Sequence, residues 1–235
     1  MAGDYAANNG EVAQVKRKRE ESSTPVVSDV GACSTAWVDK EGYGDGPEYW
    51  EKRYKEDPKP FEWLEGFEEL EALIKEAANG NQDANFLNVG CGNSLLPEGM
   101  YDHGYKSITS IDNAGTCILQ MAARNKVMRP ELKWLKMDAT KMQFEKGIFD
   151  AVIDKSVIDT FACGDNASLV ICAYLAECWR VLRPKGVFLC ISYGNPETRL
   201  AFFRQKNLEF SVRHVALPVR SAGSAHYAYV LTRID

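Results

Sequence analysis

A short apolar segment that runs directly into a glycine-rich turn constrains this chain more than any other feature. Residues 86–89 read Phe-Leu-Asn-Val, and they are followed at once by Gly90-Cys91-Gly92-Asn93-Ser94. A short, mostly apolar run ended by glycine is typical of a buried strand. Glycine also lets the backbone turn tightly and approach a ligand closely. Because ligands of open α/β sheets bind beyond the carboxyl ends of the strands, the turn at 90–94 predicts a binding site there.

Strands and helices alternate along the rest of the chain. The sequence predicts strands at 86–89, 107–112, 132–138, 149–154, 187–192, 209–217 and 226–234, and helices at 67–77, 116–128, 168–182 and 198–205. We expect Arg183-Pro184-Lys185-Gly186 to end the third of these helices. The alternation favours an α/β fold in which a mainly parallel sheet has helices on both faces. The last two strands have no helix between them, so we expect them to pair antiparallel.

Composition separates the first 45 residues from the rest. Of the 235 residues, 45% are apolar and 26% are charged, which is the balance of a globular protein. Residues 1–45 are rich in small, polar and charged residues without a helical or strand period, so we expect a disordered tail followed by one domain at 46–235. The tail contains Lys16-Arg17-Lys18-Arg19, which is typical of a nuclear import signal, a phosphate-contacting patch or a solvated charged stretch.

Charge, hydropathy and cysteine content argue against several classes of protein. No segment approaches the ~18 uncharged apolar residues of a membrane-spanning helix, and we expect no secretory signal. The net charge of −5 argues against bulk electrostatic binding to nucleic acid. The seven cysteines have no C-x-x-C spacing and the three histidines are scattered, so we expect reduced thiols and no metal site. We expect a monomer in the cytoplasm, with the nucleus as a second possible location.

Two acidic residues at later strand ends indicate which ligand the turn would hold. Asp112 lies 22 residues after Gly90, where a carboxylate can accept hydrogen bonds from both ribose hydroxyls of an adenosine. Asp138 ends the third predicted strand, from which a side chain can reach the adenine amine. Leu95 stands where a dinucleotide fingerprint has its third glycine, and no G-K-[ST] sequence is present. These features predict an adenosine site that does not require phosphates, which suits S-adenosylmethionine.

Several segments resemble a known family. Residues 87–94 resemble motif I of the class I S-adenosylmethionine-dependent methyltransferases, and residues 180–186 resemble the turn before their fifth strand. A narrower resemblance, over roughly residues 46–235, is to the elongation factor 1-alpha lysine methyltransferases of the methyltransferase-like protein 13 and endothelin-converting enzyme 2-associated types. It rests on Y-W-x-x-R-Y at 49–54, Glu62-Trp63 and D-K-S-x-I-D at 154–159. The resemblance implies a seven-stranded, Rossmann-like methyltransferase sheet that ends in an antiparallel strand pair.

The resemblance also implies which residues contact the cofactor: Trp50, Tyr54, Trp63, Gly90, Asp112, Asn113, Asp138, Ala139 and Lys155. Aromatic faces would attract the positive sulfonium by about 0.5–2 kcal/mol. Structural roles remain open for the same residues. The aromatic side chains could fix an N-terminal helix to the sheet, Asp112 could cap a helix, and Lys155 could be a surface lysine.

The acceptor is less defined than the cofactor. A lysine acceptor has a reference pKa of about 10.4 and must lose a proton before it attacks. Candidate catalytic residues are Asp154 and Asp159, expected on the loop after the fourth strand, and Tyr193 after the fifth. Relatives that methylate adenine or amides carry N/D-P-P-Y/F where this chain has residues 154–157, which argues against those acceptors. We therefore expect a methyltransferase acting on a protein lysine, for example in a translation elongation factor. The alternatives are a small-molecule methyltransferase and a non-catalytic cofactor-binding subunit.

Overall fold

The computed structural model describes residues 46–205, 207–218 and 225–235. The predicted tail, with its basic run at 16–19, lies outside the described residues. The elements are α1 (Pro47–Glu56), α2 (Phe67–Ala77), β1 (Phe86–Val89), α3 (Leu96–Asp102), β2 (Ile108–Asp112), α4 (Gly115–Asn125), β3 (Lys133–Lys136), β4 (Phe149–Lys155), α5 (Val157–Cys163), α6 (Ala167–Val181), β5 (Leu182–Ser192), α7 (Pro196–Phe203), β6 (Phe210–Ala216) and β7 (Tyr227–Arg233).

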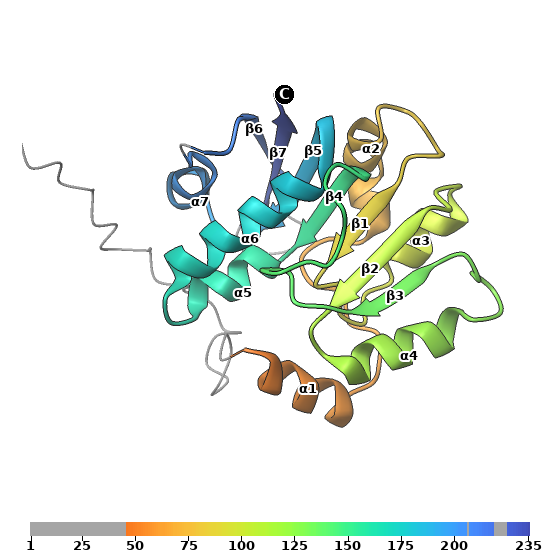
Figure 1. Ribbon diagram of the computed structural model, residues 1–235. Helices are drawn as coiled ribbons and strands as arrows, with labels where there is room; N and C mark the ends of the chain where they lie inside the picture. The colour runs from red at the N-terminus through yellow and green to blue at the C-terminus, as the bar shows by residue number, and fades with distance from the viewer. Residues whose placement is uncertain (1–45, 206, 219–224) are drawn as a thin grey trace, which may run out of the picture. The chain divides into compact units, whose positions relative to one another are not determined.

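The strands form one seven-stranded sheet in the order β3-β2-β1-β4-β5-β7-β6 (Figure 1). Strands β1 to β5 pair in parallel, whereas β7 runs antiparallel to both β5 and β6. The predicted α/β sheet with an antiparallel strand pair at its end is therefore confirmed. The chain builds the sheet outward from β1 to β3 and then returns to the other side of β1 with β4. This reversal creates the switch point at which open α/β sheets bind ligands.

Both faces of the sheet are covered, which explains why its central strands are apolar along their whole length. Successive side chains of a strand point to opposite faces. In β5, Leu189 and Ile191 pack into a core cluster that includes Leu70 of α2. The ring of Phe188, the residue before Leu189, lies on the other face, and its centroid is 6.1 Å from that of the Tyr174 ring of α6. Helices α2 and α6 thus bury alternate residues of the same strand.

The structure differs from the sequence prediction around residues 183–186. This segment was expected to precede the fifth strand, but it lies within β5 (Leu182–Ser192). Leu182 pairs with Phe149 and Val187 pairs with Ala151, so extra residues on β5 form an irregularity in the ladder. Such an irregularity bends a strand without ending it, because pairing resumes on both sides. Leu182 is fully buried, which keeps the start of β5 in the sheet.

Helices α1, α3 and α5 were not predicted from the sequence. Helices α3 and α5 have seven residues each, about two turns, which is too short for a helical period to show. Helix α1 buries a single residue, Tyr54, so it carries no apolar stripe. Within the described ranges, no helix combines the length and the apolar character needed to cross a membrane.

Two leucines test the assignment of the core. Leu70 of α2 is fully buried, whereas Leu119 of α4 is 73% exposed. We expect Leu70→Ala to lower the free energy of unfolding by about 2–5 kcal/mol, because it removes buried methyl groups and leaves a cavity. The matched change Leu119→Ala should shift it by no more than about 0.5 kcal/mol. Denaturant unfolding of both variants measures the difference, and similar losses would contradict the placement of α2.

Candidate active site

The turn after β1 needs glycine at two positions. Gly90 and Gly92 have φ values of +53° and +51°, in the left-handed region that favours glycine. Space imposes the same requirement. A Cβ atom on Gly90 would lie 2.4 Å from Cγ2 of Val157, and one on Gly92 would lie 2.8 Å from the hydroxyl oxygen of Tyr54. The turn is therefore in close contact with α5 on one side and with α1 on the other.

A pocket opens beside this turn, at the carboxyl ends of β1, β2 and β4. The space at the pocket, open solvent included, is about 870 Å³. Its lining residues are Trp50, Tyr54, Phe61, Trp63, Asn88, Gly90, Cys91, Gly92, Asn93, Ser94, Asp112, Asn113, Met137, Asp138, Ala139, Lys155, Ser156, Val157, Thr160 and Phe161. All nine residues predicted to contact the cofactor are among them, and the structure brings them together from six separate segments of the chain.

Asp112 connects two of the segments that form the pocket. Its Oδ2 accepts a hydrogen bond from the backbone N–H of Gly92, and its Oδ1 accepts one from the N–H of Ala114, both at 2.9 Å. Burial raises the pKa of this carboxyl above its usual value, and the backbone donors oppose that shift. Each carboxylate oxygen can accept a second hydrogen bond. The side chain can therefore hold the two turns together and still accept hydrogen bonds from a ribose.

The far end of the pocket carries the residues after β2 and β3. Asn113 directly follows β2, and Asp138 and Ala139 lie just beyond β3. Asp138 is exposed, and its Oδ1 accepts hydrogen bonds from the N–H and hydroxyl of Thr140 at 2.8 and 2.7 Å. This part of the lining is suited to the edge of a purine base, because it offers backbone and side-chain polar groups on one side.

Aromatic side chains close the pocket on the α1 side. Trp50 and Tyr54 lie one helical turn apart on α1, and their rings stack with centroids 6.0 Å apart. The ring of Trp63, on the segment before α2, meets Trp50 edge-on at 6.4 Å. The guanidinium of Arg53 lies 5.3 and 5.5 Å from the ring centroids of Phe61 and Trp63. The segment between α1 and α2 therefore folds against α1 and forms a wall of the pocket.

Lys155 and Glu62 fasten that segment to the sheet. The ammonium of Lys155 donates to a carboxylate oxygen of Glu62 and, at 2.8 Å, to the carbonyl of Trp63. Burial lowers the pKa of Lys155, and the charge of Glu62 opposes that shift. Glu62 also accepts hydrogen bonds from the hydroxyl of Ser94 and the N–H of Leu95, at 2.6 and 3.0 Å. This role of Glu62 was not predicted from the sequence, although the Glu62-Trp63 pair is part of the resemblance.

The candidate catalytic carboxylates occupy different positions from those expected. Asp154 lies in β4 and Asp159 lies in α5, so the prediction that both lie on a loop is wrong. Helix α5 begins two residues after β4 ends, because the carboxylate of Asp154 accepts a hydrogen bond from the backbone N–H of Val157 at 2.9 Å. Asp154 also accepts one from the hydroxyl of Tyr174 at 2.8 Å. Its carboxylate is therefore bound inside the protein and is absent from the pocket lining.

Asp159 and Tyr193 do not line the pocket either, although Asp159 accepts a hydrogen bond from the hydroxyl of the lining residue Ser156 at 3.3 Å. Asp159 forms a buried ion pair with Arg199 at 2.9 Å and accepts hydrogen bonds from the hydroxyl of Ser192 and the backbone N–H of Tyr193. The ring of Tyr193 lies 5.8 Å from that of His226. Among the described residues, no group of three or more His, Cys, Asp or Glu side chains is placed to hold a metal ion.

Comparison with known proteins agrees with this geometry. Residues 87–190 match the family model described as a methyltransferase domain. The chain is 38% identical over 148 residues to "eEF1A lysine and N-terminal methyltransferase" of Bos taurus, covering 62% of this chain and 21% of that protein. It is 29% identical over 194 residues to "EEF1A lysine methyltransferase 4" of Mus musculus, covering 78% and 74%. The chain thus spans about a fifth of the length of the first relative.

Solved structures show the same fold at low sequence identity. PH0226 protein of Pyrococcus horikoshii OT3 aligns with a TM-score of 0.58 and 18% identity, over 77% of this chain and 98% of that one. The N-methyltransferase NodS of Bradyrhizobium japonicum WM9, in complex with S-adenosylhomocysteine, aligns with a TM-score of 0.57 and 15% identity, over 80% and 98%.

The sheet order, the pocket at its switch point and the match of residues 87–190 to a methyltransferase domain give the chain the fold of the class I S-adenosylmethionine-dependent methyltransferases. Its sequence is similar, more particularly, to those of elongation factor 1-alpha lysine methyltransferases. Both resemblances found in the sequence are therefore confirmed. The pocket residues suit this cofactor, because a glycine turn and a carboxylate after β2 can hold an adenosine beside aromatic faces.

The contact between Gly92 and Tyr54 can be tested with a matched pair of glycines. We expect Gly92→Ala to lower affinity for S-adenosylhomocysteine, the demethylated product, at least tenfold (about 1.4 kcal/mol). The new Cβ would lie 2.8 Å from the Tyr54 hydroxyl and would move the turn or the ring. Gly80 has a φ of +70° but nothing within 4 Å of its Cβ position. Gly80→Ala therefore carries similar backbone strain and should leave the affinity unchanged. Calorimetric titration compares them, and equal affinities would contradict the assignment.

The buried carboxyl of Asp154 should make stability depend on pH. Burial raises its pKa to about 7, although the Tyr174 hydroxyl and backbone N–H groups oppose the shift. In the unfolded chain the pKa is near 3.8, so the folded state binds the proton more tightly. The resulting stabilisation is complete below about pH 4 and is lost as the pH rises through 7.

We expect the free energy of unfolding of the wild type, relative to Asp154→Asn, to fall by roughly 2–3 kcal/mol between about pH 5 and pH 8. Asparagine mimics the protonated acid and does not titrate, so the variant provides the reference at each pH. Denaturant unfolding at the two pH values measures the difference. A difference that does not change with pH would show that Asp154 is ionised throughout.

Proposed function

We propose that this protein transfers methyl groups from S-adenosylmethionine to a lysine side chain of a protein, and that its substrate is a translation elongation factor of the 1-alpha type. The observation that carries the proposal is the pocket, because all nine residues assigned to the cofactor line it. The printed names of the relatives from Bos taurus and Mus musculus support lysine and elongation factor 1-alpha as the acceptor.

The residues of the pocket suggest how the cofactor would be held. S-adenosylmethionine, when bound, supplies an activated methyl group on a positively charged sulfur. Asp112 would accept hydrogen bonds from the ribose, and residues 137–139 would flank the adenine. Trp50, Tyr54 and Trp63 would exclude water and offer aromatic faces to the positive charge. These assignments join the turns after β1, β2 and β3 into one nucleoside site.

The acceptor nitrogen must be neutral when it attacks the methyl carbon, because a protonated amine has no lone pair to form the bond. The carboxylates of Asp154 and Asp159 are held by internal partners, so neither is assigned as the proton acceptor. Positioning of the lysine and exclusion of water would supply much of the acceleration.

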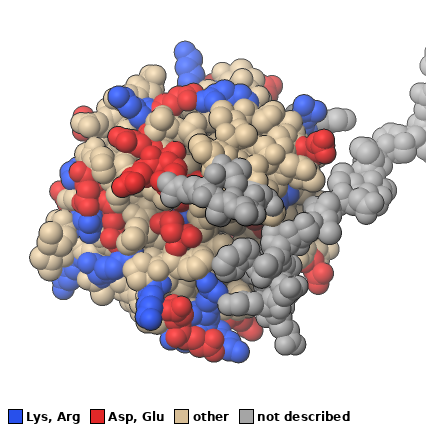
Figure 2. All heavy atoms as spheres, turned by 180° about the vertical axis from the view of Figure 1, so that it is seen from behind, with Lys and Arg blue, Asp and Glu red and all other residues tan. Residues whose placement is uncertain are grey.

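The acidic balance of the chain favours a protein over a nucleic acid as acceptor. On the face shown in Figure 2, Lys and Arg side chains are scattered among Asp and Glu side chains. A surface that binds nucleic acid usually gathers cations on one face or along one helix. The chain as a whole is acidic, with a net charge of −5. A monomeric enzyme in the cytoplasm, with the nucleus as a second location, completes the proposal.

Methylation of purified elongation factor 1-alpha by the full chain tests the proposal. With labelled S-adenosylmethionine, we expect label in the elongation factor band, and mass spectrometry should place the methyl group on a lysine rather than at the N-terminus. Asp112→Ala serves as the control, because loss of the ribose contact should lower cofactor affinity at least tenfold. Label found only in small molecules of a cell extract would support a small-molecule methyltransferase. Cofactor binding without any transfer would support a non-catalytic subunit.

A further inference from the structure

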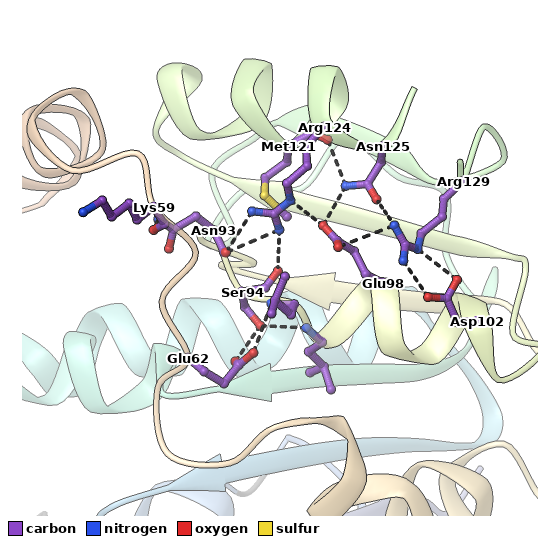
Figure 3. Close-up of polar contacts among 12 residues, drawn as sticks. Lys59, Glu62, Asn93, Ser94, Glu98, Asp102, Met121, Arg124, Asn125 and Arg129 are labelled. Atoms are coloured by element: carbon purple, nitrogen blue, oxygen red, sulfur yellow. Dashed lines mark hydrogen bonds and ion pairs between the residues drawn. The ribbon is translucent and has the colours of Figure 1, made fainter. Parts of the chain in front are cut away.

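Arg124 connects α4 to the glycine turn from outside the pocket. Its Nη2 donates a hydrogen bond to the carbonyl of Ser94 at 3.2 Å, and both terminal nitrogens lie 3.5 Å from the carbonyl oxygen of Asn93. Its Nε donates to a carboxylate oxygen of Glu98 on α3. Figure 3 shows the guanidinium between Glu98 on one side and the backbone of Asn93 and Ser94 on the other.

This contact bridges two parts of the nucleoside site. Asn93 and Ser94 line the pocket and are only 5% exposed, so their carbonyl groups need donors from the protein. Helix α4 begins at Gly115, three residues after Asp112. Arg124 therefore joins the helix that follows β2 to the turn that follows β1. Any shift of α4 relative to that turn would change the distance between the glycine backbone and the residues after β2.

The opposite side of the turn is held by an anion. Glu62 accepts hydrogen bonds from the hydroxyl of Ser94 and the N–H of Leu95. The side-chain amide of Asn93 donates to the carbonyl of Lys59. Arg124 thus binds the carbonyl oxygens at the end of the turn, whereas Glu62 and the carbonyl of Lys59 bind its hydroxyl, N–H and side-chain amide. Charge-assisted hydrogen bonds of this kind are stronger than neutral ones and fix geometry.

We propose that Arg124 is a positioning residue for cofactor binding, which holds the glycine turn at the correct distance from Asp112 and Asn113. The inference rests on the proposed function only in that the pocket must bind S-adenosylmethionine or its product. Arg124 does not line the pocket, so its effect on affinity would act through the backbone of Asn93 and Ser94.

Arg129 provides a matched control in the same network. It lies 3.5 Å from the other carboxylate oxygen of Glu98, and it forms an ion pair with Asp102 at the end of α3. The side chains of Arg124 and Arg129 are 27% and 20% exposed. Within the described ranges, the contacts of Arg129 reach Glu98, Asp102 and Asn125 but not the glycine turn. Replacing either arginine removes a cation from Glu98, but only the replacement of Arg124 removes hydrogen bonds to the glycine turn.

The test compares Arg124→Gln with Arg129→Gln in the full chain. We expect Arg124→Gln to raise the dissociation constant of S-adenosylhomocysteine at least fivefold, and Arg129→Gln to change it less than twofold. Thermal unfolding should show a lower melting temperature for both. With a methyl acceptor, Arg124→Gln should raise KM for S-adenosylmethionine more than it lowers kcat. A purely structural role would lower affinity in proportion to stability in both variants.

Equal changes in affinity for the two variants, with normal binding by the wild type, would overturn the inference and leave the proposed function intact. Absence of S-adenosylhomocysteine binding by the wild type at millimolar concentration would instead overturn the proposed function, and the inference with it. If Arg124→Gln does not unfold cooperatively, Arg124→Lys and Arg129→Lys replace the pair. A lysine keeps the charge near Glu98 but cannot reach two carbonyl groups as a guanidinium does, so Arg124→Lys should still bind more weakly than Arg129→Lys.

Discussion

The carboxylate of Asp112 is the interaction on which the site depends. It accepts the N–H of Gly92 with one oxygen and the N–H of Ala114 with the other, so it joins the turns that follow two neighbouring parallel strands. Such turns are separate loops whose spacing the sheet alone does not determine. A buried carboxylate requires these donors, because burial raises its pKa and disfavours its charge. The two N–H groups that stabilise the carboxylate therefore also fix the positions of the two turns that form the pocket.

The sequence carried enough local information to predict the sheet and part of the lining of the pocket. Phe86–Val89 is a short apolar run ended by glycine, and Asp112 and Asp138 stand where later strands end. In a parallel sheet the carboxyl ends of the strands share one edge, so residues at strand ends meet without further knowledge of packing. Trp50, Tyr54 and Trp63 were predicted from the family resemblance alone. Local sequence did not indicate α1, because this helix has no apolar stripe.

Long-range pairing explains what the sequence could not supply. Whether Asp154 and Asp159 face the pocket is decided by Tyr174 and Arg199, which lie 20 and 40 residues away in the chain. The position of the Lys155 ammonium is likewise decided by Glu62, at a separation of 93 residues. The local sequence pattern of an acidic residue after a strand is the same whether its side chain binds substrate or caps the next helix.

These pairs also explain why two parts of the pocket are held in different ways. The turns after β1 and β2 are joined by a carboxylate bonded to backbone N–H groups, and they belong to the sheet. The segment before α2, by contrast, contacts the sheet through the side chains of Glu62 and Lys155. The side chain of Lys155 is only 6% exposed, so loss of the contact with Glu62 would leave a buried charge unpaired and would release the segment from the sheet. The turns after β1 and β2 would therefore select the cofactor, whereas the Glu62–Lys155 contact would determine whether the cofactor is enclosed.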